Sequence, residues 1–516
     1  MNHTFSRYAD WKAPDEDGQL LLWPDPSTLL RQTTENRRSL SNSKALIQNV
    51  PLSELRQRQR HWVGHTQDDQ PLIATGHQTE LYHPGVWVKD ALTNALARKL
   101  GGRPWHFAVD TDAPKHLHLR WPGGSMPITD DERLNTAAWS GLLHSPTPAH
   151  VGEIEVALQE ARDSWDFEPM AGGFLASLKL LALQHLPLPA GLTGAVQQLD
   201  LSLGLRQQAL LLSPVWTCEP YLVFVHHLLA RPGPFAAEYN TALAGYRKEQ
   251  GITSQGRPMP DLEVGPDEIE TAFWLDDLDG DSRRRLMVRR VEGGWALSIS
   301  KGRAPQSGRL NGLSDEDAFV FRGSTPGYDA AARLLEYLRQ HHLRIAPRAL
   351  PLTMFFRMFL ADQYVHGIGG GRYDQVTDCI IAGHFGIDPP RFSVTTATLY
   401  FPAARGQKRV SLRPLLQEGR RLRHGSFWRE KRNLADRIAT LPRRSRERSA
   451  LFSEMHANLA RQASSDTLRE WSVRLDHATR EQMRQKAVFD RELFFGIQPE
   501  DRLRELISRY DAATDV

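Results

Sequence analysis

The sequence predicts an α/β protein with a doubly wound parallel sheet as its core. A mostly helical insert with a small β-meander interrupts this core, and an α-helical region follows it. Residues 72–112 and 364–400 each have the pattern of a strand, a crossover helix and a second strand. Between them, apolar residues mostly recur at helical spacing. Beyond residue 403 the chain keeps helical spacing and becomes rich in arginine.

Length and composition are those of a multidomain globular protein. The 516 residues exceed what one core usually holds, so about two to four domains are expected. The net charge of +3 gives no overall attraction to nucleic acid. Cys218 and Cys379 form no CxxC pair, which argues against disulfides and a thiolate zinc site. Without a secretory signal pattern or a run of about 18 apolar residues, the protein is expected to be cytoplasmic and free of membranes.

The first strand–helix–strand unit begins with a short apolar strand at Leu72–Ala74. A helix is expected from about Val86 to Leu100, and the two glycines that follow Leu100 are expected to end it. A second strand is expected from Trp105 to Val109. Open α/β sheets bind ligands beyond the carboxyl ends of their strands, so polar residues near these ends are candidate site residues. They are Thr75, Gly76, His77, Gln78, His83, Gly85, Asp110 and Asp112.

The second unit contains a glycine-rich loop, 366–371, which is the strongest single signal in the sequence. Four glycines in five residues cost backbone entropy, so a close ligand contact is expected there. An anion cradle of backbone N–H groups at a helix start fits this loop, and a tight strand-to-helix turn is the structural alternative. The helix is expected from about Tyr373 to Phe385, with Asp374 as a cap or a catalyst. The candidates are His366, Gly367, Gly369, Gly370, Gly371, Tyr373 and Asp374.

The chain is expected to divide into five parts. Pro, Gly, Ser and Thr dominate from about 122 to 148 and mark the exit from the first half of the core. The parts are an N-terminal helical extension (1–70), the first half of the core (71–121), an inserted connecting region (122–335), the second half of the core (336–402) and a helical, arginine-rich C-terminal domain (403–516). The insert is expected to hold a helical block at 150–250 and the β-meander at 261–300.

Two histidines of the first unit invite a chemical role. His77 is a candidate acid, base or donor to a negative oxygen, and packing under Trp87 is its structural alternative. His83–Gly85 has the position of the HxGH motif in class I adenylyl-transferring enzymes, whose imidazoles contact nucleotide phosphates. Val86 stands where the second histidine would be, and no KMSKS-like loop follows. If ATP is used, its phosphates are expected at this turn.

Parts of the sequence also resemble sites for two other ligand classes, a divalent metal and RNA. The carboxylates after the second strand, together with His116 and His118, resemble a divalent metal site. An alternating strand at 115–121 with an exposed polar face explains these histidines without metal, so no metal ligands are assigned. The arginine-rich segment 405–448 could bind RNA, but it lacks interleaved aromatic residues and is more typical of solvated helix faces.

Motifs from both units occur in the order, spacing and strand context of a known family. They are TGHQ at 75–78 with HPG at 83–85, VDTD at 109–112, HGIGGGRYD at 366–374, and FGIDPPR at 385–391 with ATL at 397–399. Together they resemble the bacillithiol-synthesis cysteine-adding enzymes, cysteine ligases of the class I synthetase-like Rossmann superfamily. That family has TGQQ, SEDHD, GGPGE and FGV-P-R-SATL motifs at these places. The resemblance covers about residues 70–120 and 345–400.

The resemblance implies a Rossmann-like core, a coiled-coil C-terminal domain and a ligase that joins an amine to a carboxylate. Gly76, His77 and the glycines at 367–371 would hold anionic groups, and Arg391 of the last motif joins the binding residues. Asp110 or Asp112 would hold an ammonium group or act as a base. His366 or His77 would move the proton. ATP or ADP is the implied nucleotide, and an amino acid and an amine acceptor are the implied substrates. A homodimer through the C-terminal helices is compatible with this scheme.

The sequence also departs from the family at three positions. His77 replaces glutamine, Thr111 replaces the histidine of the acidic cluster, and Arg372 or Tyr373 stands in place of the glutamate after the glycine turn. Because the contact residues differ while the scaffold motifs are kept, the resemblance implies that this chain is a divergent relative of the family with a different substrate. The alternative is a non-catalytic small-molecule or nucleotide-binding protein on the same scaffold, with RNA binding as a third hypothesis.

Overall fold

The structure of the protein, a computed structural model, describes residues 11–65, 70–299, 318–424, 428–462 and 466–515. The chain forms two compact units. One comprises residues up to 399 together with 491–516, and the other is Tyr400–Asp490. The larger unit contains a mixed six-stranded sheet and a separate antiparallel sheet of five strands. The predicted mixed α/β class with parallel strands is therefore confirmed.

The six-stranded sheet has the order β1-β15-β14-β4-β5-β8. Its strands are β1 (Leu20–Trp23), β4 (Leu72–Gln78), β5 (Arg103–Val109), β8 (Gln208–Leu211), β14 (Gln363–His366) and β15 (Phe392–Ala397). All neighbouring pairs are parallel except β1 with β15. The chain adds β5 and β8 on one side of β4, and it later adds β14 and β15 on the other. The direction of addition thus reverses between β4 and β14, where open α/β sheets bind ligands.

Two helices connect the strands on either side of this reversal. α3 (Pro84–Leu100) joins β4 to β5, and α11 (Ile368–Phe385) joins β14 to β15. Each ends in a left-handed glycine, Gly101 with φ 62° and Gly386 with φ 64°, as is common at helix C-termini. β14 and β15 are buried along their whole length, which is typical of parallel strands covered by helices.

Element boundaries near the reversal differ from the expected ones. β4 continues to Gln78, so Thr75–Gln78 form the end of the strand and not a loop after it. α11 begins at Ile368, so the glycines at 369–371 lie in its first turn and not in a loop. Glycine has a low helix propensity, which hides this helix start in the sequence. Packing of the helix against the sheet decides the conformation instead.

The region expected as an insert also contributes to the central sheet. Its strand β8 pairs with β5. The expected helical block contains α4 (Pro148–Arg162), α5 (Ala171–Ala182), α6 (Leu188–Ser202), α7 (Glu219–Ala230) and α8 (Pro232–Gln250). The strand expected at 115–121 is shorter, because β6 begins at His118 and pairs with β7 (Gly124–Pro127). His116 has φ 48° and precedes that strand, so the two histidines do not share a strand face.

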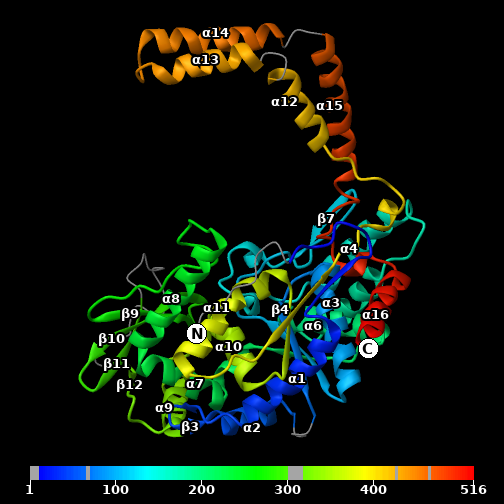
Figure 1. Ribbon diagram of the computed structural model, residues 1–516. Helices are drawn as coiled ribbons and strands as arrows, with labels where there is room; N and C mark the ends of the chain where they lie inside the picture. Colours follow the sequence, from blue (N-terminus) through cyan, green and yellow to red (C-terminus); the bar gives the residue numbers. More distant parts are fainter. Residues whose placement is uncertain (1–10, 66–69, 300–317, 425–427, 463–465, 516) are drawn as a thin grey trace. The chain divides into compact units, whose positions relative to one another are not determined.

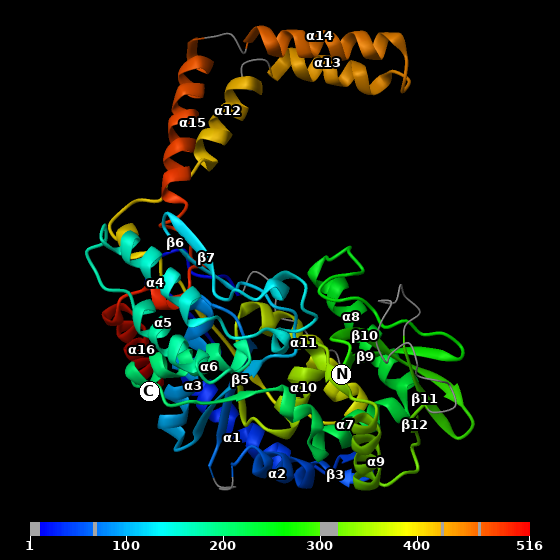
Figure 2. The same cartoon turned by 180° about the vertical axis from the view of Figure 1, so that it is seen from behind.

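The expected β-meander is confirmed over its described residues, and residue 300 lies outside them. It is part of the five-stranded antiparallel sheet, whose order is β12-β11-β10-β9-β13. The strands are β9 (Glu268–Asp277), β10 (Ser282–Val291), β11 (Gly294–Ile299), β12 (Val320–Phe321) and β13 (Leu343–Pro347). β9–β12 and α16 (Glu500–Thr514) lie at opposite sides of the larger unit (Figures 1 and 2).

Helices from the N-terminal region and from the second half of the core complete the larger unit. They are α1 (Pro26–Ser41), α2 (Leu52–Trp62), α9 (Gly327–Gln340) and α10 (Ala349–Phe359), with the short strands β2 (Leu46–Ile47) and β3 (Val50–Pro51) before α2. Buried Asp362 aligns the starts of β4 and β14, because its carboxylate accepts from Leu72 N at 2.8 Å and pairs with Arg56 and Arg60 of α2. Such a buried pair is costly to break, since the remaining charge would be uncompensated.

The smaller unit is helical over its described residues. It contains α12 (Arg413–His424), α13 (Trp428–Thr440), α14 (Arg446–Gln462) and α15 (Asp466–Gln485). α12 packs along α15 and α13 packs along α14. Residues 425–427 and 463–465 of the expected helical region lie outside the described residues. The last helix of that region, α16, packs on α3 in the larger unit. None of the described helices is both long and apolar enough to cross a membrane.

Candidate functional site

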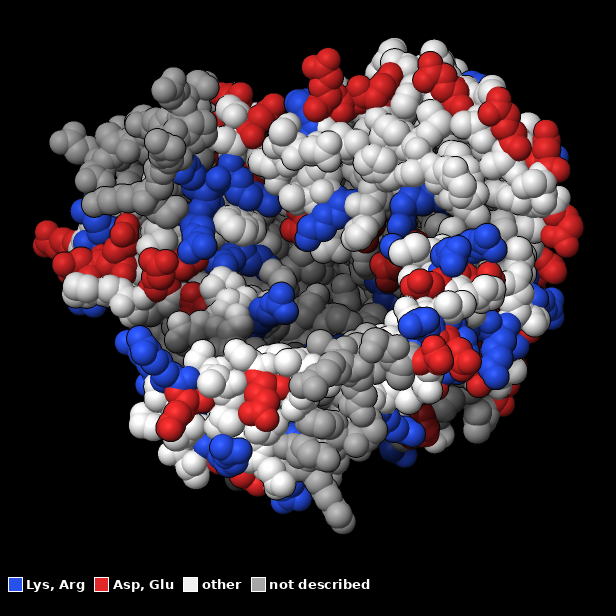
Figure 3. Space-filling model, turned by 90° about the horizontal axis from the view of Figure 1, so that it is seen from above, with Lys and Arg blue, Asp and Glu red and all other residues white. Residues whose placement is uncertain are grey.

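A cavity of about 560 Å³ lies at the point where the order of strand addition reverses. Its lining comes from the carboxyl ends of β4 and β14, the starts of α3, α10 and α11, and the segment before α16. This volume lies in the range of small-molecule sites, roughly 300–1,000 Å³. One face of the molecule is hollowed, and Lys and Arg side chains stand around the hollow (Figure 3). Size and position make this cavity the candidate site.

The end of β4 forms one wall of the cavity. A Cβ atom on Gly76 would lie 2.8 Å from the Phe107 carbonyl oxygen and 3.0 Å from the Tyr364 hydroxyl oxygen. Only glycine therefore fits between these neighbours without a shift. Two residues on, Gln78 Nε2 donates to Asp112 Oδ2 at 3.0 Å. This bond brings the candidates that follow β4 and β5 together at the cavity.

His77 is held by a neighbouring acid. Its Nδ1 lies 3.2 Å from Glu80 Oε1, and its ring lies 5.7 Å from the Tyr82 ring. Trp87, the expected packing partner, stacks instead against Phe495. Burial, aided by Lys89, lowers the pKa of His77 well below 6.5, and burial raises the pKa of Glu80 to about 7. His77 is therefore neutral, and its Nδ1 is within hydrogen-bonding distance, 3.3 Å, of the Gln78 carbonyl oxygen.

His83 caps α3 and uses up the N–H groups of its first turn. His83 Nδ1 accepts from Gly85 N at 3.1 Å, and its carbonyl oxygen accepts from Val86 N and Trp87 N. α3 therefore offers its dipole to an anion but no free N–H group from these residues. Burial lowers the pKa of His83 to about 4, so the imidazole is neutral and its proton is on Nε2. Gly85 is required because a Cβ there would lie 2.6 Å from the Ala397 carbonyl oxygen.

The start of α11 does have free N–H groups. Gly367 is the N-cap residue, and its carbonyl oxygen accepts from Gly371 N at 3.0 Å. The N–H groups of Ile368–Gly370 have no acceptor among the described residues, and all three residues line the cavity. A Cβ on Gly369 would meet nothing within 4 Å. The first turn of α11 is therefore an open row of donors at the positive end of an 18-residue helix.

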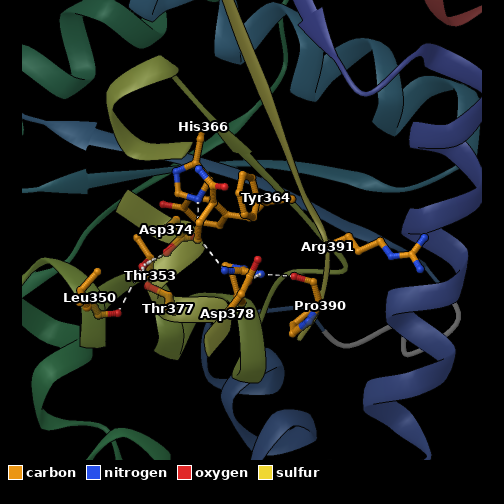
Figure 4. A network of polar contacts seen from close by, with 12 residues as sticks. Leu350, Thr353, Tyr364, His366, Asp374, Thr377, Asp378, Pro390 and Arg391 are labelled. Atoms are coloured by element: carbon orange, nitrogen blue, oxygen red, sulfur yellow. Dashed lines mark hydrogen bonds and ion pairs between the residues drawn. The ribbon is translucent and has the colours of Figure 1, made fainter. Parts of the chain in front are cut away.

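His366, at the end of β14, is oriented by a buried carboxylate (Figure 4). Its Nε2 lies 2.8 Å from Asp374 Oδ2. Asp374 is fully buried and also accepts from Thr353 Oγ1 at 2.5 Å and Arg357 Nη1 at 2.8 Å. A Cβ on Gly370 would lie 2.7 Å from His366 Nδ1. Glycine at this position thus leaves room for the second nitrogen of the imidazole at the cavity wall.

The protonation states of His366 and Asp374 suit a role of His366 as a general base. Burial lowers the pKa of His366, and Asp374 only partly offsets this effect. Burial alone would raise the pKa of Asp374, but the charges of Arg357 and His366 outweigh it and hold that pKa well below its usual range. At neutral pH, His366 therefore donates its Nε2 proton to an ionised carboxylate. Its Nδ1 stays unprotonated, as a general base requires.

Lys89 and Tyr364 also line the cavity, next to Gly76. Lys89 Nζ donates to the Gly76 carbonyl oxygen at 2.6 Å, and its side chain forms no ion pair among the described residues. Burial lowers the pKa of Lys89 to about 8, so it is an ammonium at neutral pH. Burial raises the pKa of Tyr364 far above its usual range, so its hydroxyl is neutral. That hydroxyl has no hydrogen-bond partner among the described residues.

Most of the predicted site residues meet at this cavity. Those that line it are Gly76, His77, Gln78, His83, Gly85, Asp112, His366, Gly367, Gly369, Gly370 and Tyr373. Asp374 lies behind His366 and contacts it. The structure places Thr75, Asp110, Gly371 and Arg391 outside the lining.

These outlying residues have structural partners instead. Thr75 Oγ1 donates to the Val365 carbonyl oxygen. Asp110 Oδ1 accepts from the backbone N–H groups of Leu212 and Ser213, which ties the end of β5 to the segment after β8. Gly371 packs where a Cβ would overlap Val394. Arg391 is exposed, points away from the His366 network and lies 3.4 Å from Glu35 (Figure 4).

Several lining residues were not predicted from the sequence. They include Lys89, Thr353, Tyr364, Thr396, Arg491 and Glu492. Lys89 carried a usable signal, because Lys89 and Asp90 are the only charged residues of α3 before the basic last turn at Arg98 and Lys99. Tyr364 and Thr353 read as ordinary strand and helix residues. Arg491 and Glu492 are distant in sequence from both strand–helix–strand units, so only the folded chain brings them to the site.

Two further observations concern metal ions and a second cavity. Among the described residues, no group of three or more His, Cys, Asp or Glu side chains is arranged to hold a metal ion. A second cavity, between β5 and α6, measures about 20 Å³. It has room for about one water molecule. No family model matches the chain, and no curated protein is significantly similar to it.

Proposed function

We propose that this chain is a ligase that joins an amine to a carboxylate, on a Rossmann-like scaffold similar to that of the bacillithiol cysteine-adding enzymes. The strand order supports this scaffold, because parallel strands added in two directions from a central pair are typical of nucleotide-binding folds. One observation carries the proposed chemistry. A single cavity combines an imidazole oriented by a carboxylate, at His366, with unpaired backbone N–H groups at Ile368–Gly370.

The reaction needs an activated carboxylate, because an amine and a carboxylate do not condense spontaneously in water. ATP would supply a phosphate leaving group for this purpose. The cavity residues fit a phosphate, since N–H groups at a helix N-terminus and a lysine ammonium are common phosphate donors. Ile368–Gly370 and Lys89 would provide them. The first turn of α3 would contribute only its dipole, because His83 already occupies its N–H groups.

The chain would then handle the proton of the amine. As the amine nitrogen bonds to the acyl carbon, His366 Nδ1 takes one of its protons, and the leaving group departs with its electron pair. The carboxylate of Asp374 stabilises the imidazolium that forms. An oriented general base of this kind contributes roughly 10²–10⁴-fold to a rate. Asp112 and Glu492, which also line the cavity, supply negative charge to hold an ammonium group of a substrate.

One feature favours a second hypothesis, a binding protein without turnover. Because His83 binds the N–H groups of α3 and Val86 replaces the second histidine of an HxGH motif, the usual adenylyl-transfer contacts are missing. The His366–Asp374 pair weighs against this hypothesis, since binding alone does not require an oriented, unprotonated nitrogen. The two hypotheses differ in nucleotide consumption.

The smaller unit and the location of the protein complete the proposal. The pairing of α12 with α15 and of α13 with α14 is in keeping with a coiled-coil domain that holds a homodimer. Sedimentation of the full chain and of a chain lacking 413–485 tests this role. We place the protein in the cytoplasm, because the free thiols of Cys218 and Cys379 suit a reducing compartment.

A turnover screen tests the ligase proposal. The full chain is incubated with ATP and single amino acids, cysteine included, together with amino-sugar acceptors. Coupled products are detected by mass spectrometry, and ADP or AMP release is measured in parallel. We expect one nucleotide consumed per product, and loss of both signals in His366→Ala. His61→Ala, an exposed histidine in the last turn of α2, is the matched control and should behave as wild type. Nucleotide binding without turnover would favour the binding-protein hypothesis.

A further inference from the structure

We propose that Lys89, Tyr364 and the first turn of α11 form an oxyanion subsite, which holds a carboxylate or phosphate group of the substrate. The inference deepens the proposed function and rests on it for the statement that this oxyanion belongs to a reacting molecule. Binding at the subsite requires no turnover, so it is measurable on its own. Three independent features of the cavity point to the same ligand chemistry.

The first feature is a buried ammonium group without an anionic partner. Lys89 is 3% exposed, and its Nζ donates one hydrogen bond to the Gly76 carbonyl oxygen. No carboxylate among the described residues pairs with it. Burying an unpaired charge is costly, so native proteins normally supply a counter-charge. The cavity that Lys89 lines is where a ligand could provide it.

The charges around Lys89 do not replace that ligand. Asp90, on the same helix, lies 2.8 Å from His106, and Glu80 lies 3.2 Å from His77. Both carboxylates favour the charged form of Lys89, but they only partly offset the effect of burial on its pKa. The remaining titratable neighbours are His83 and His366, which are neutral near pH 7 because burial lowers the pKa of each. Lys89 itself keeps its proton at neutral pH, since burial lowers its pKa only to about 8. The site therefore presents a positive charge to the cavity.

The second feature is the hydroxyl group of a largely buried tyrosine, which makes no hydrogen bond among the described residues. Tyr364 of β14 is 5% exposed and lines the cavity. Its hydroxyl has no partner among the described residues, although buried tyrosine hydroxyls usually have one. It lies 3.0 Å from the place where a Cβ on Gly76 would be. Lys89 and Tyr364 therefore approach the same residue of β4, one from α3 and the other from β14.

The third feature is the row of N–H groups at Ile368–Gly370. α11 follows β14 directly, so its first turn stands next to the end of the strand that carries Tyr364. Backbone donors at the start of a long helix favour negative charge. An ammonium, a neutral hydroxyl and these donors together match an oxyanion with several acceptor lone pairs. Asp112 and Glu492 line the same cavity and would repel an anion placed beside them, which fixes the orientation of a zwitterionic substrate.

Isothermal titration calorimetry tests the subsite with two probes, inorganic pyrophosphate and L-cysteine, on the full chain. The variants are Lys89→Met and Tyr364→Phe, with Lys99→Met as the control because Lys99 is an exposed lysine of the same helix. We expect Lys89→Met to weaken binding by more than about tenfold, since a charge-assisted hydrogen bond is lost. Tyr364→Phe should weaken it several-fold. Lys99→Met should change nothing. A response to pyrophosphate identifies a phosphate subsite, and a response to L-cysteine identifies a carboxylate subsite.

Two results would overturn the subsite: neither probe binds the wild-type chain, or both variants bind with unchanged affinity. Circular dichroism and the melting temperature verify that each variant is folded, and Tyr364→Phe provides a second route if Lys89→Met does not fold. The outcome is separable from that of the ligase proposal. Loss of probe binding in Lys89→Met without turnover in any chain would keep the subsite and refute the ligase. Turnover with unchanged KM in Lys89→Met would keep the ligase and refute the subsite.

Discussion

Replacing Asp374 with asparagine removes the carboxylate that orients His366. Asp374 has no exposed surface and accepts hydrogen bonds from His366, Thr353 and Arg357. Arg357 is itself buried, and it retains contacts with Asp378 and the Pro390 carbonyl oxygen in the variant. Removing one partner of a buried ion pair costs about 3–5 kcal/mol. Because Arg357 keeps one carboxylate, we expect a loss of about 3 kcal/mol in the free energy of unfolding.

The same substitution should change the chemistry of His366. An amide in place of the carboxylate no longer fixes the proton on Nε2, so a mixture of tautomers is expected. Turnover, once a substrate pair is identified, should fall by roughly 10²–10⁴-fold with the loss of an oriented base. Urea denaturation measures the stability change. ¹⁵N-NMR of the imidazole measures the tautomer and does not depend on knowing the substrate.

Asp378→Asn is the matched control. Asp378 pairs with Arg357, and among the described residues it forms no hydrogen bond or ion pair with His366. Burial raises the pKa of Asp378 to about 6. This variant should lose stability while His366 keeps its Nε2–H tautomer and its turnover. An unchanged tautomer and unchanged turnover in Asp374→Asn would refute the assigned role of the pair. So would an equal loss of turnover in both variants, because that would indicate a general loss of structure.

Two further predictions concern neighbouring positions. Gly371→Ala should lower the free energy of unfolding by about 1–3 kcal/mol, because its Cβ would overlap Val394. Gly369→Ala should leave stability unchanged or raise it by up to about 1 kcal/mol, while its methyl group weakens probe binding. Equal urea midpoints for the two variants would contradict this prediction. Lys89→Met should stabilise the chain by on the order of 3 kcal/mol at pH 7, since the folded pKa of Lys89, about 8, lies below the unfolded 10.5. Between these two pKa values the unfolded chain binds more protons than the folded chain, so wild-type stability rises from pH 8 to 10.5 and the advantage of the variant disappears. A variant that is less stable than wild type at pH 7 would refute the statement that the charge of Lys89 is unpaired.

Local patterns were sufficient to predict much of the fold. The strand–helix–strand units at both ends of the core were found because each carries its own periodicity and its own glycine stop signals. β8 and β13 were missed because short strands are stabilised by their partners, β5 and β9, which lie far away in sequence. The start of α11 was missed for the opposite reason, since the local preference of three glycines conflicts with the helix that packing enforces.

The residues of the candidate site also fall into those that local sequence patterns predict and those that they do not. Residues that follow a strand were predicted, because the carboxyl ends of parallel strands meet at one edge of the sheet. Asp110 followed this rule and still lies outside the cavity, since backbone N–H groups after β8 capture its carboxylate. Tyr364 was missed because its position at the cavity depends on β4 pairing with β14, elements about 290 residues apart. Lys89 is local to the first unit, where it contacts Gly76, and its charge in an apolar part of α3 could have indicated it.

A crystal structure of the full chain with ATP and an amino acid would locate the substrate directly. We predict an anionic group within hydrogen-bonding distance of Lys89, Tyr364 and the N–H groups of Ile368–Gly370, with the amine facing His366 Nδ1. A ligand bound outside this cavity, or a His366 Nδ1 that makes its hydrogen bond to the protein instead of the ligand, would contradict the assignment of this cavity as the active site.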